Sequence, residues 1–398
     1  VQDKFLSPGF TLGGPLLIPG TDFNQNRDKA FFFLGYEYYL QRLDVQAHRS
    51  WVPTEAMRAG DFSQADQLGL TGRYSNTPPN GYPRGIVPPG EWDTRGQVLL
   101  NAFPLPDADP ARPGGYNYVL HPIVDNDMTQ LLARVDVNLR PATKLYARYN
   151  RQRQNQDWPF CLWYAGTNTV PYPAPAIGRA DSDSGTISLT HVFDPTLTGE
   201  TIFGITHIRL PNELTNREAA SRQALGYPYE GIFGQHGDML PGVTMWPGGP
   251  EYLQWGGFDP ILGPDNWQVS AQANLTKVAG AHTLKLGLYY GQVTADQGGD
   301  GVNHGAVILA AERWVPNTTG NTFADLLLGQ AAQYNEQTAN VNHDFIHRRL
   351  EAFVQDSWRV SPRFTLDLGV RVSSLSPWSD REGNGLAAWD LERYDPEA

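Results

Sequence analysis

The sequence predicts an all-β protein, an antiparallel up-and-down transmembrane β-barrel whose strands here number about ten, arranged as five hairpins with long external loops. Apolar and polar residues alternate over strand-length segments, the pattern of strands with one apolar and one wet face. Four of the five hairpin turns are very short, whereas every link between hairpins is long, as in barrels with tight turns at one rim. No run of 18 or more apolar residues occurs, so no transmembrane helix is predicted. The mean hydropathy of -0.43 fits a soluble protein or a barrel equally well.

Composition narrows the class of protein further. The 398 residues, 40% of them hydrophobic, suffice for a large core or a long barrel wall. A formal net charge of -12 argues against a nucleic-acid partner, because no basic field attracts phosphates. Cys161 is the single cysteine, which excludes an internal disulfide and a cysteine metal site, and its apolar neighbours favour an inert buried thiol. The chain starts with Val1 and shows no signal peptide, so we expect a mature product or a fragment.

Five strand pairs are expected in order along the chain. They lie near residues 10–45, 129–154, 184–210, 266–294 and 345–375. The last pair is the clearest, since apolar and polar residues alternate without a break from Phe364 to Val372, after a turn at Pro362. The third pair alternates less cleanly, at His207 and Arg209.

Long excursions are expected between the pairs, at residues 46–128, 155–183, 211–265 and 296–343. Three short helices are predicted inside them, the first capped by Thr54, the second by Asp93 or Thr94, and the third within residues 321–329. Loops of this length are uncommon in a compact soluble domain and usually carry function.

Several short motifs follow one another in a fixed order across nearly the whole chain. They are Thr11-Leu12-Gly13-Gly14-Pro15, Asn26-Arg27-Asp28-Lys29 with Phe31-Phe32-Phe33 and Tyr36-Glu37, Val52-Pro53-Thr54, Arg58 with Gly60-Asp61-Phe62-Ser63, Phe103-Pro104-Leu105-Pro106, Ala324-Asp325-Leu326-Leu327-Leu328-Gly329 and Phe353-Val354-Gln355-Asp356-Ser357-Trp358. Together they resemble the TonB-dependent outer-membrane receptors, in particular the Oar-like branch with a carboxypeptidase-regulatory-like N-terminal domain.

The resemblance implies a barrel of 22 strands with a plug domain inside, in the cell outer membrane. On that basis residues 1–398 are the N-terminal part of the barrel, with the plug and the C-terminal strands absent. The implied partners are outer-membrane lipid, an unknown bulky nutrient ligand, and a TonB-type energy-coupling complex reached through the missing N-terminal part. No energy-coupling residue can be carried over to this sequence.

Seven charged side chains are expected to face the barrel interior. They are Arg134, Asp136, Lys144, Arg148, Lys285, Asp367 and Arg371. A charge on the lipid side at the bilayer midplane would cost about 2–4 kcal/mol. These residues could contact a plug or a substrate, or could pair with one another and with water, and we favour pairing.

The loop from residue 227 to residue 267 is the best candidate for ligand capture. Its aromatic candidates are Tyr227, Tyr229, Trp246, Tyr252, Trp255 and Trp267. Aromatic platforms suit sugars, peptides and siderophores, although packing within the loop explains the same residues equally well.

No catalytic constellation, cofactor motif or metal site is predicted. His236 with Asp238 is too small a set for a metal ion. Asp125 with Asp127, and Asp181 with Asp183, lack a downstream acidic ligand and favour turn capping over calcium binding.

Three functional hypotheses remain open from the sequence. The first is a receptor that binds a nutrient at its external loops for energised import. The second is a surface adhesion or assembly protein that uses the same barrel without import. The third is a soluble all-β binding module, which requires the apolar strand faces to be buried.

Overall fold

The structure is a computed structural model of the chain, and every structural statement below concerns the residues that it describes. These are residues 3–44, 47–67, 77–109, 115–159, 170–171, 176–232, 238–246, 251–252, 264–297, 304–311, 315–338 and 343–383.

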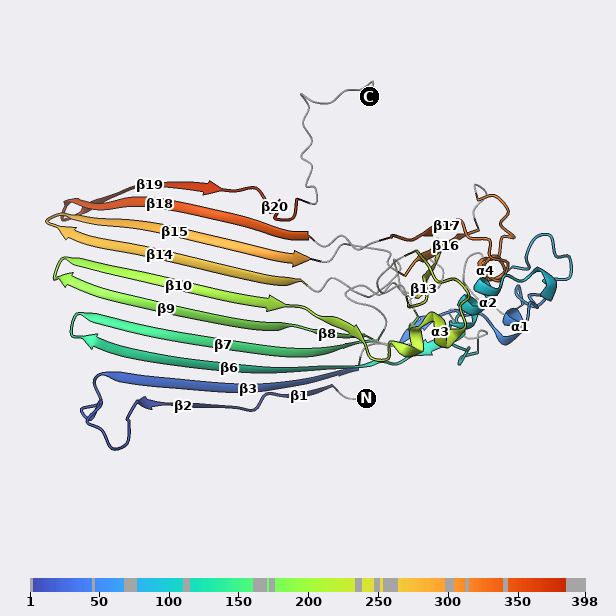
Figure 1. Cartoon of the computed structure of the whole chain (residues 1–398), viewed down its shortest axis with the longest axis horizontal. Coiled ribbons are helices and arrows are strands. Elements are labelled where there is room, and N and C mark those ends of the chain that lie inside the picture. The colour runs from blue at the N-terminus through green and yellow to red at the C-terminus, as the bar shows by residue number, and fades with distance from the viewer. Residues whose placement is uncertain are drawn as a thin grey trace, which may run out of the picture.

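One large antiparallel sheet dominates the described chain (Figure 1). Its strands are β1 (Lys4–Leu6), β2 (Gly9–Pro15), β3 (Ala30–Asp44), β6 (Ile123–Arg140), β7 (Thr143–Trp158), β9 (Asp181–Asp194), β10 (Leu197–Arg209), β14 (Asp265–Ala279), β15 (His282–Gln297), β18 (His343–Ser361) and β19 (Phe364–Leu375). Apart from β1 and β2, which both pair with β3, each long strand pairs with the next long strand in sequence. The sheet is open and ends at β19. The predicted up-and-down topology of about ten strands in five hairpins is confirmed.

Cross-strand register gives this sheet one apolar and one polar face, because directly paired residues point to the same side. One apolar row crosses seven strands through Val135, Ala147, Ile187, Phe203, Ala271, Tyr290 and Leu350. The neighbouring polar row runs through Arg134, Arg148, Thr186, Gly204, Ser270, Gly291 and Arg349. Leu288 and Val372 on the apolar face are 60% and 66% exposed, so none of the described elements covers this face there.

The height of the apolar face matches a membrane. On β14 it runs from Trp267 to Lys277, ten residue steps, or about 34 Å along the strand. A strand tilt of about 40° reduces this to about 26 Å along the membrane normal, close to the apolar band of outer-membrane barrels. No helix in the described ranges is both long enough and apolar enough to cross a membrane.

The long excursions fold together at one end of the sheet, on the right in Figure 1. Their larger elements are β4 (His48–Ser50), α1 (Glu55–Arg58), α2 (Thr94–Asn101), β5 (Tyr118–Leu120), α3 (Arg222–Leu225), β12 (Gly242–Trp246), β13 (Glu251–Tyr252), β16 (Ala306–Ala310), α4 (Thr322–Leu327) and β17 (Gln333–Asn335). Two short 3-10 helices, η1 (Pro89–Glu91) and η2 (Glu218–Ala220), belong to the excursions as well. Three short strands extend the large sheet instead: β8 (Ala176–Arg179) pairs with β7, β11 (Asn212–Leu214) pairs with β8, and β20 (Ser379–Asp380) pairs with β18. We call the described parts of residues 47–120, 215–252 and 304–338 the first, second and third loop segments, and together the loop assembly.

The predicted helices are confirmed, with their caps. The side chain of Thr54 accepts a hydrogen bond from the backbone N–H of Met57 at the start of α1. Asp93 and Asn321 cap α2 and α4 in the same way. Such caps satisfy backbone donors that have no partner within the helix.

Pairing of distant strands and a shared core hold the loop assembly together. β12 of the second segment pairs in parallel with β16 of the third, inside a four-stranded sheet ordered β13-β12-β16-β17. The core beneath it draws on all three segments, through side chains such as Phe62, Leu100, Met239, Leu240, Leu309, Phe323 and Leu326. The excursions, which were expected to be loops with three short helices, therefore form a packed unit, because their scattered apolar side chains bury one another once the strands align.

Candidate ligand-binding site in the loop assembly

A pocket of about 380 Å³ opens among the three loop segments. This is within the usual size range of small-molecule sites. Its lining residues are Asp93, Arg95, Gly96 and Leu99 from the first segment, Tyr227 and Tyr229 from the second, and Val307, Leu309, Leu326, Gly329, Ala331 and Tyr334 from the third. Because each segment supplies part of the wall, the pocket exists only when all three are assembled.

Aliphatic side chains form the deep part of the pocket. Leu99, Leu309 and Leu326 are almost fully buried and belong to the core of the assembly. Helices α2 and α4 bring the first and last of these together, and the contact is unusually close at Gly96. A Cβ atom on Gly96 would lie 1.8 Å from the carbonyl oxygen of Leu326, so only glycine fits there.

An ion pair between Asp93 and Arg95 lies at the start of α2, on the pocket wall. The carboxylate of Asp93 accepts backbone hydrogen bonds from Arg95 and Gly96, of 2.8 and 3.1 Å. The same carboxylate accepts from Nε and Nη2 of Arg95, at 3.1 and 2.6 Å. The Arg95 guanidinium holds the pKa of Asp93 below its ordinary value, so Asp93 stays ionised.

A second network, around Glu336, joins the second and third segments. The carboxylate of Glu336 accepts hydrogen bonds from the hydroxyls of Tyr229 and Tyr334, of 3.0 and 2.9 Å, and from the backbone N–H of Ile232. Its partner charge is Arg222, whose Nη2 lies 3.6 Å from Oε1 of Glu336.

Arg222 is itself a buried cross-link. Its guanidinium donates to the carbonyl oxygens of Met239, Tyr229 and His304, at 2.9, 2.9 and 2.6 Å. Both Arg222 and the carboxylate of Glu336 are shielded from water, which makes their mutual compensation important for the assembly.

Tyr227 combines burial with an unused hydroxyl. Only 8% of the residue is exposed, and its side chain belongs both to the core and to the pocket wall. Among the described residues its hydroxyl makes no hydrogen bond. Burial raises the pKa of Tyr227 to about 12, so the hydroxyl remains a proton donor at physiological pH.

The structure brings together two of the six aromatic candidates, Tyr227 and Tyr229. Trp246 ends β12 and is mostly exposed, and it does not line the pocket, whereas Tyr252 lies on the neighbouring strand β13. Trp255 lies outside the described residues. Trp267 belongs to β14 of the large sheet, where its ring stacks on His207 at 3.9 Å.

Sequence reasoning missed most of the pocket. The sequence predicts Asp93 only as a helix cap, and no sequence pattern marks Arg95, Tyr334 or Glu336 as part of a site. Their proximity depends on contacts between residues far apart in the chain, such as Tyr229 and Glu336, which are 107 positions apart, and no local pattern reveals such contacts.

All seven charged candidates of the strands lie on the polar face of the large sheet, as the register shows. Two of them, Arg134 and Asp136, form a bidentate pair with distances of 2.8 and 2.7 Å. Arg371 donates to Glu351 at 2.9 Å, and Asp367 accepts from Ser357. The carboxylate of Glu351 is nearly buried and also binds Arg349, a pairing that the sequence did not reveal.

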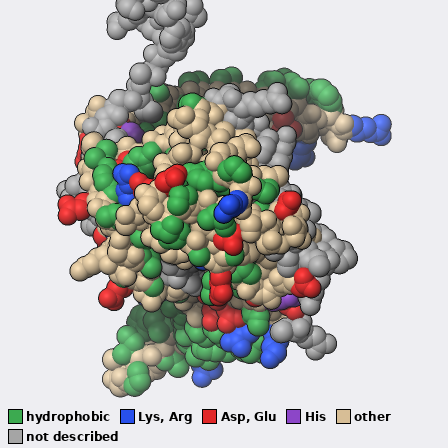
Figure 2. All heavy atoms as spheres, turned by 90° about the vertical axis from the view of Figure 1, so that its right-hand side faces the viewer, with side chains coloured by type: hydrophobic (Ala, Val, Ile, Leu, Met, Phe, Trp, Pro, Cys, Tyr) green, Lys and Arg blue, Asp and Glu red, His purple; other side chains and the backbone are tan. Residues whose placement is uncertain are grey.

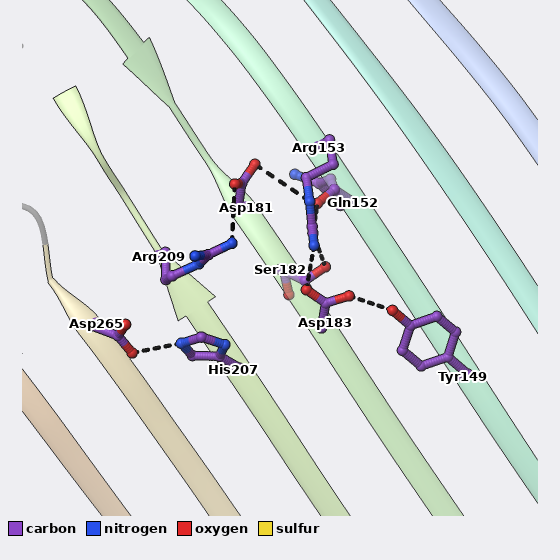
Figure 3. Close-up of polar contacts among 9 residues, drawn as sticks. All are labelled: Tyr149, Gln152, Arg153, Asp181, Ser182, Asp183, His207, Arg209 and Asp265. Atoms are coloured by element: carbon purple, nitrogen blue, oxygen red, sulfur yellow. Dashed lines mark hydrogen bonds and ion pairs between the residues drawn. The ribbon is translucent and has the colours of Figure 1, made fainter. Parts of the chain in front are cut away.

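A belt of charged side chains borders the apolar face at the end nearest the loop assembly (Figure 3). Arg153 of β7 binds Asp183 of β9 at 2.6 Å and lies 3.8 Å from Asp181. Arg209 of β10 approaches Asp181 as well, and His207 contacts Asp265 at 2.5 Å. His207 and Arg209, which interrupt the apolar alternation in the sequence, therefore mark the edge of the apolar face.

Four of the acidic side chains considered for metal binding, Asp125, Asp181, Asp183 and Asp238, lie close to arginines. Asp181 and Asp183 belong to the belt just described, and Asp125 lies 3.3 Å from Nε of Arg42. Asp238 pairs with Arg217, whereas His236 lies outside the described residues. The described ranges contain no group of three His, Cys, Asp or Glu side chains that could hold a metal ion.

Comparison with solved structures finds remote neighbours. The outer membrane transporter YddB from Escherichia coli shares 9% identity, with a TM-score of 0.42 over 93% of this chain and 34% of that one. A mutant of the ferric enterobactin receptor PfeA from Pseudomonas aeruginosa shares 11%, with a TM-score of 0.42 over 94% and 38%. The siderophore receptor PirA from Acinetobacter baumannii shares 10%, with a TM-score of 0.42 over 95% and 37%.

These three neighbours are much longer proteins, and this chain spans little more than a third of their length. A search among curated proteins finds no match. The model of one protein family, described as an outer membrane beta barrel domain, matches residues 4–397. That match covers nearly the whole chain and agrees with the up-and-down sheet and its exposed apolar face. The chain therefore belongs to the outer membrane β-barrel domain family, and its place is the cell outer membrane.

Proposed function

We propose that the chain is part of an outer-membrane receptor that binds an external ligand with its loop assembly and passes it into the barrel. The observation that carries this proposal is the pocket lined by all three loop segments at one end of the membrane-spanning sheet. An outer-membrane protein with loops for display alone would not need these segments to converge on one cavity. The exposed apolar face of the sheet argues against the soluble binding module.

The polar face of the sheet is proposed to line the barrel interior. Its charged side chains include Arg134, Asp136, Lys144, Arg148, Lys285, Asp367 and Arg371. The opposite face carries large exposed aliphatic side chains, whose transfer from water into lipid is favourable. The ion pairs of Arg134 with Asp136 and of Arg371 with Glu351 support a solvated wall more than a selective filter.

Energised import is the finer part of the proposal. It rests on the motifs that resemble the TonB-dependent receptors, and it requires a TonB-type energy-coupling complex as partner. The assignment to the Oar-like branch rests on the same motifs and stays a prediction. The surface adhesion or assembly hypothesis shares the barrel and the loops but includes no import.

A transport assay separates these functions. Cells that make the full-length receptor are supplied with a labelled mixture of peptides, oligosaccharides and iron chelates, with and without a protonophore. We expect at least one class to accumulate inside the cells and to stop accumulating when the protonophore is present. Arg222→Met, which removes the buried cross-link, should abolish that accumulation, whereas the exposed control Arg217→Met should retain it. Retention at the surface that the protonophore does not change would support adhesion instead.

A further inference from the structure

We propose that the loop-assembly pocket binds an apolar, ring-sized group that carries an acceptor oxygen, as in an aromatic acid or the carboxyl-terminal aromatic residue of a peptide. This inference rests on the proposed function only for the statement that the ligand arrives from outside. The chemistry of the ligand follows from the pocket itself.

The first step is the balance of apolar and polar wall. The wall contains four buried aliphatic side chains that also belong to the hydrophobic core, namely Leu99, Val307, Leu309 and Leu326. A strongly hydrated ligand would lose water here without compensation, whereas an aromatic ring would gain from the transfer.

The second step is the state of the acceptors around the pocket. The two oxygens of Asp93 accept four hydrogen bonds, all from Arg95 and Gly96. The two oxygens of Glu336 accept from Ile232, Tyr229 and Tyr334, with Arg222 close by. Both carboxylates are thus fully engaged within the protein. A sugar, whose hydroxyls all need acceptors as well as donors, fits such a wall poorly.

The third step is the presence of unused donors. The hydroxyl of Tyr227 has no partner among the described residues, although the residue is more than nine-tenths buried. Arg95 uses Nε and Nη2 for Asp93, and in the described ranges its Nη1 makes no hydrogen bond. The side chain of Arg95 is 57% exposed, and the Tyr227 hydroxyl is not among the described side-chain atoms that are fully buried without a partner. Both groups can therefore donate to a ligand in the pocket without first losing a hydrogen bond to a described residue. Two such donors on an apolar cavity favour a ligand with an acceptor, such as a carboxylate or a carbonyl.

The end of the molecule that carries the loop assembly faces the viewer in Figure 2, where apolar and charged side chains are mixed without one dominant charge. Long-range attraction of an anion is therefore not expected, since the net charge of the chain is -12. Selectivity should come from contacts at short range inside the pocket.

The test is calorimetric titration of the full chain in lipid nanodiscs, with empty discs as the blank. The probes are 3-phenylpropanoate, an acetylated tripeptide ending in phenylalanine, the amide of that tripeptide, and methyl β-glucoside. We expect saturable binding of one or both of the first two probes, and none of the glucoside. Preference for the acid or for the tripeptide identifies the source of the ligand group, and weaker binding of the amide would show that a carboxylate is preferred to a carbonyl.

Three variants place the binding. Tyr227→Phe removes only the hydroxyl and should lower the affinity for the bound probe about five- to tenfold. Ala331→Trp, at an exposed position on the pocket wall, should block the pocket and abolish binding. The matched control is Tyr118→Phe, because Tyr118 is equally buried in the same core but does not line the pocket, and this variant should bind like the unchanged chain.

The proposal is overturned if neither aromatic probe binds, if the glucoside binds more tightly, or if the three variants bind alike. Such a result leaves the transport assay unaffected, since protonophore-sensitive uptake could then proceed through another part of the loops. Conversely, specific binding without uptake would preserve the pocket and refute import.

Discussion

Gly96 is the position where a single methyl group should do most damage to the loop assembly. Its Cβ atom would lie 1.8 Å from the Leu326 carbonyl oxygen and 3.3 Å from the backbone nitrogen of Gly329. Contacts of this type need more than 3 Å, so α2 and α4 would have to separate by more than 1 Å. Overpacking of this kind costs about 3 kcal/mol, and the better helix propensity of alanine returns about 1 kcal/mol. We therefore expect Gly96→Ala to destabilise the assembly by about 2 kcal/mol.

Hydrogen exchange is the suitable measurement, because global unfolding is dominated by the large sheet. The backbone N–H of Leu328, which donates to Ala324 at the end of α4, should exchange about thirtyfold faster in Gly96→Ala. The matched control is Gly90→Ala, since no atom lies within 4 Å of a Cβ there. That variant should leave the exchange rate unchanged or slightly slower. Equal protection of Leu328 in the two variants would refute the close approach of the helices.

Three further predictions follow from the same structure. Arg222→Met removes the charge partner of the buried Glu336 carboxylate and should lower the unfolding free energy of the loop assembly, measured with denaturant, by about 3–5 kcal/mol. The exposed control Arg217→Met should lower it by less than about 1 kcal/mol. Equal effects of the two substitutions would contradict the buried cross-link. Leu288→Arg on the apolar face should cost about 2–4 kcal/mol in lipid vesicles. Gln355→Arg on the polar face places a like charge opposite Lys285 and should cost less than about 1 kcal/mol. The reverse order of the two costs would mean that the two faces are exchanged. The pKa of Asp93 is lowered in the folded state, so its carboxylate should stabilise the assembly at pH values above its unfolded pKa, near 3.9. This stabilisation should be lost as the pH falls through the folded pKa. Asp93→Asn, which keeps the cap, should remove this acid-dependent loss from a plot of unfolding free energy against pH, a change of less than about 1 kcal/mol.

The strands could be predicted from the sequence because their signal is local. A strand with one face in lipid must alternate residue by residue, so Phe364 to Val372 reveals its faces without knowledge of any partner strand. Helix caps are local for the same reason, and Thr54, Asp93 and Asn321 could be recognised in advance.

The pocket could not be predicted in this way. The aromatic rings of Tyr227 and Tyr229 make these residues candidates in the sequence, but their neighbours Arg95, Tyr334 and Glu336 come from segments far away in the chain. What joins them is tertiary contact, above all the parallel pairing of β12 with β16 and the crossing of α2 and α4. Trp267 stands where the predicted loop meets the strand pair predicted near residues 266–294, and it belongs to β14 of the large sheet.

The pairing of β12 with β16 has a mechanical consequence. β12 precedes the β14–β15 hairpin in sequence and β16 follows it. The ladder between β12 and β16 therefore joins the segment before this hairpin to the segment after it. Because β12 and β16 are hydrogen-bonded to each other, a ligand that moves one of them also moves the other, on the opposite side of the same hairpin in sequence. The hairpin in turn shares long ladders with β10 and β18. A ligand bound in the loop assembly would thus be connected through the covalent chain to two adjacent strands of the barrel wall.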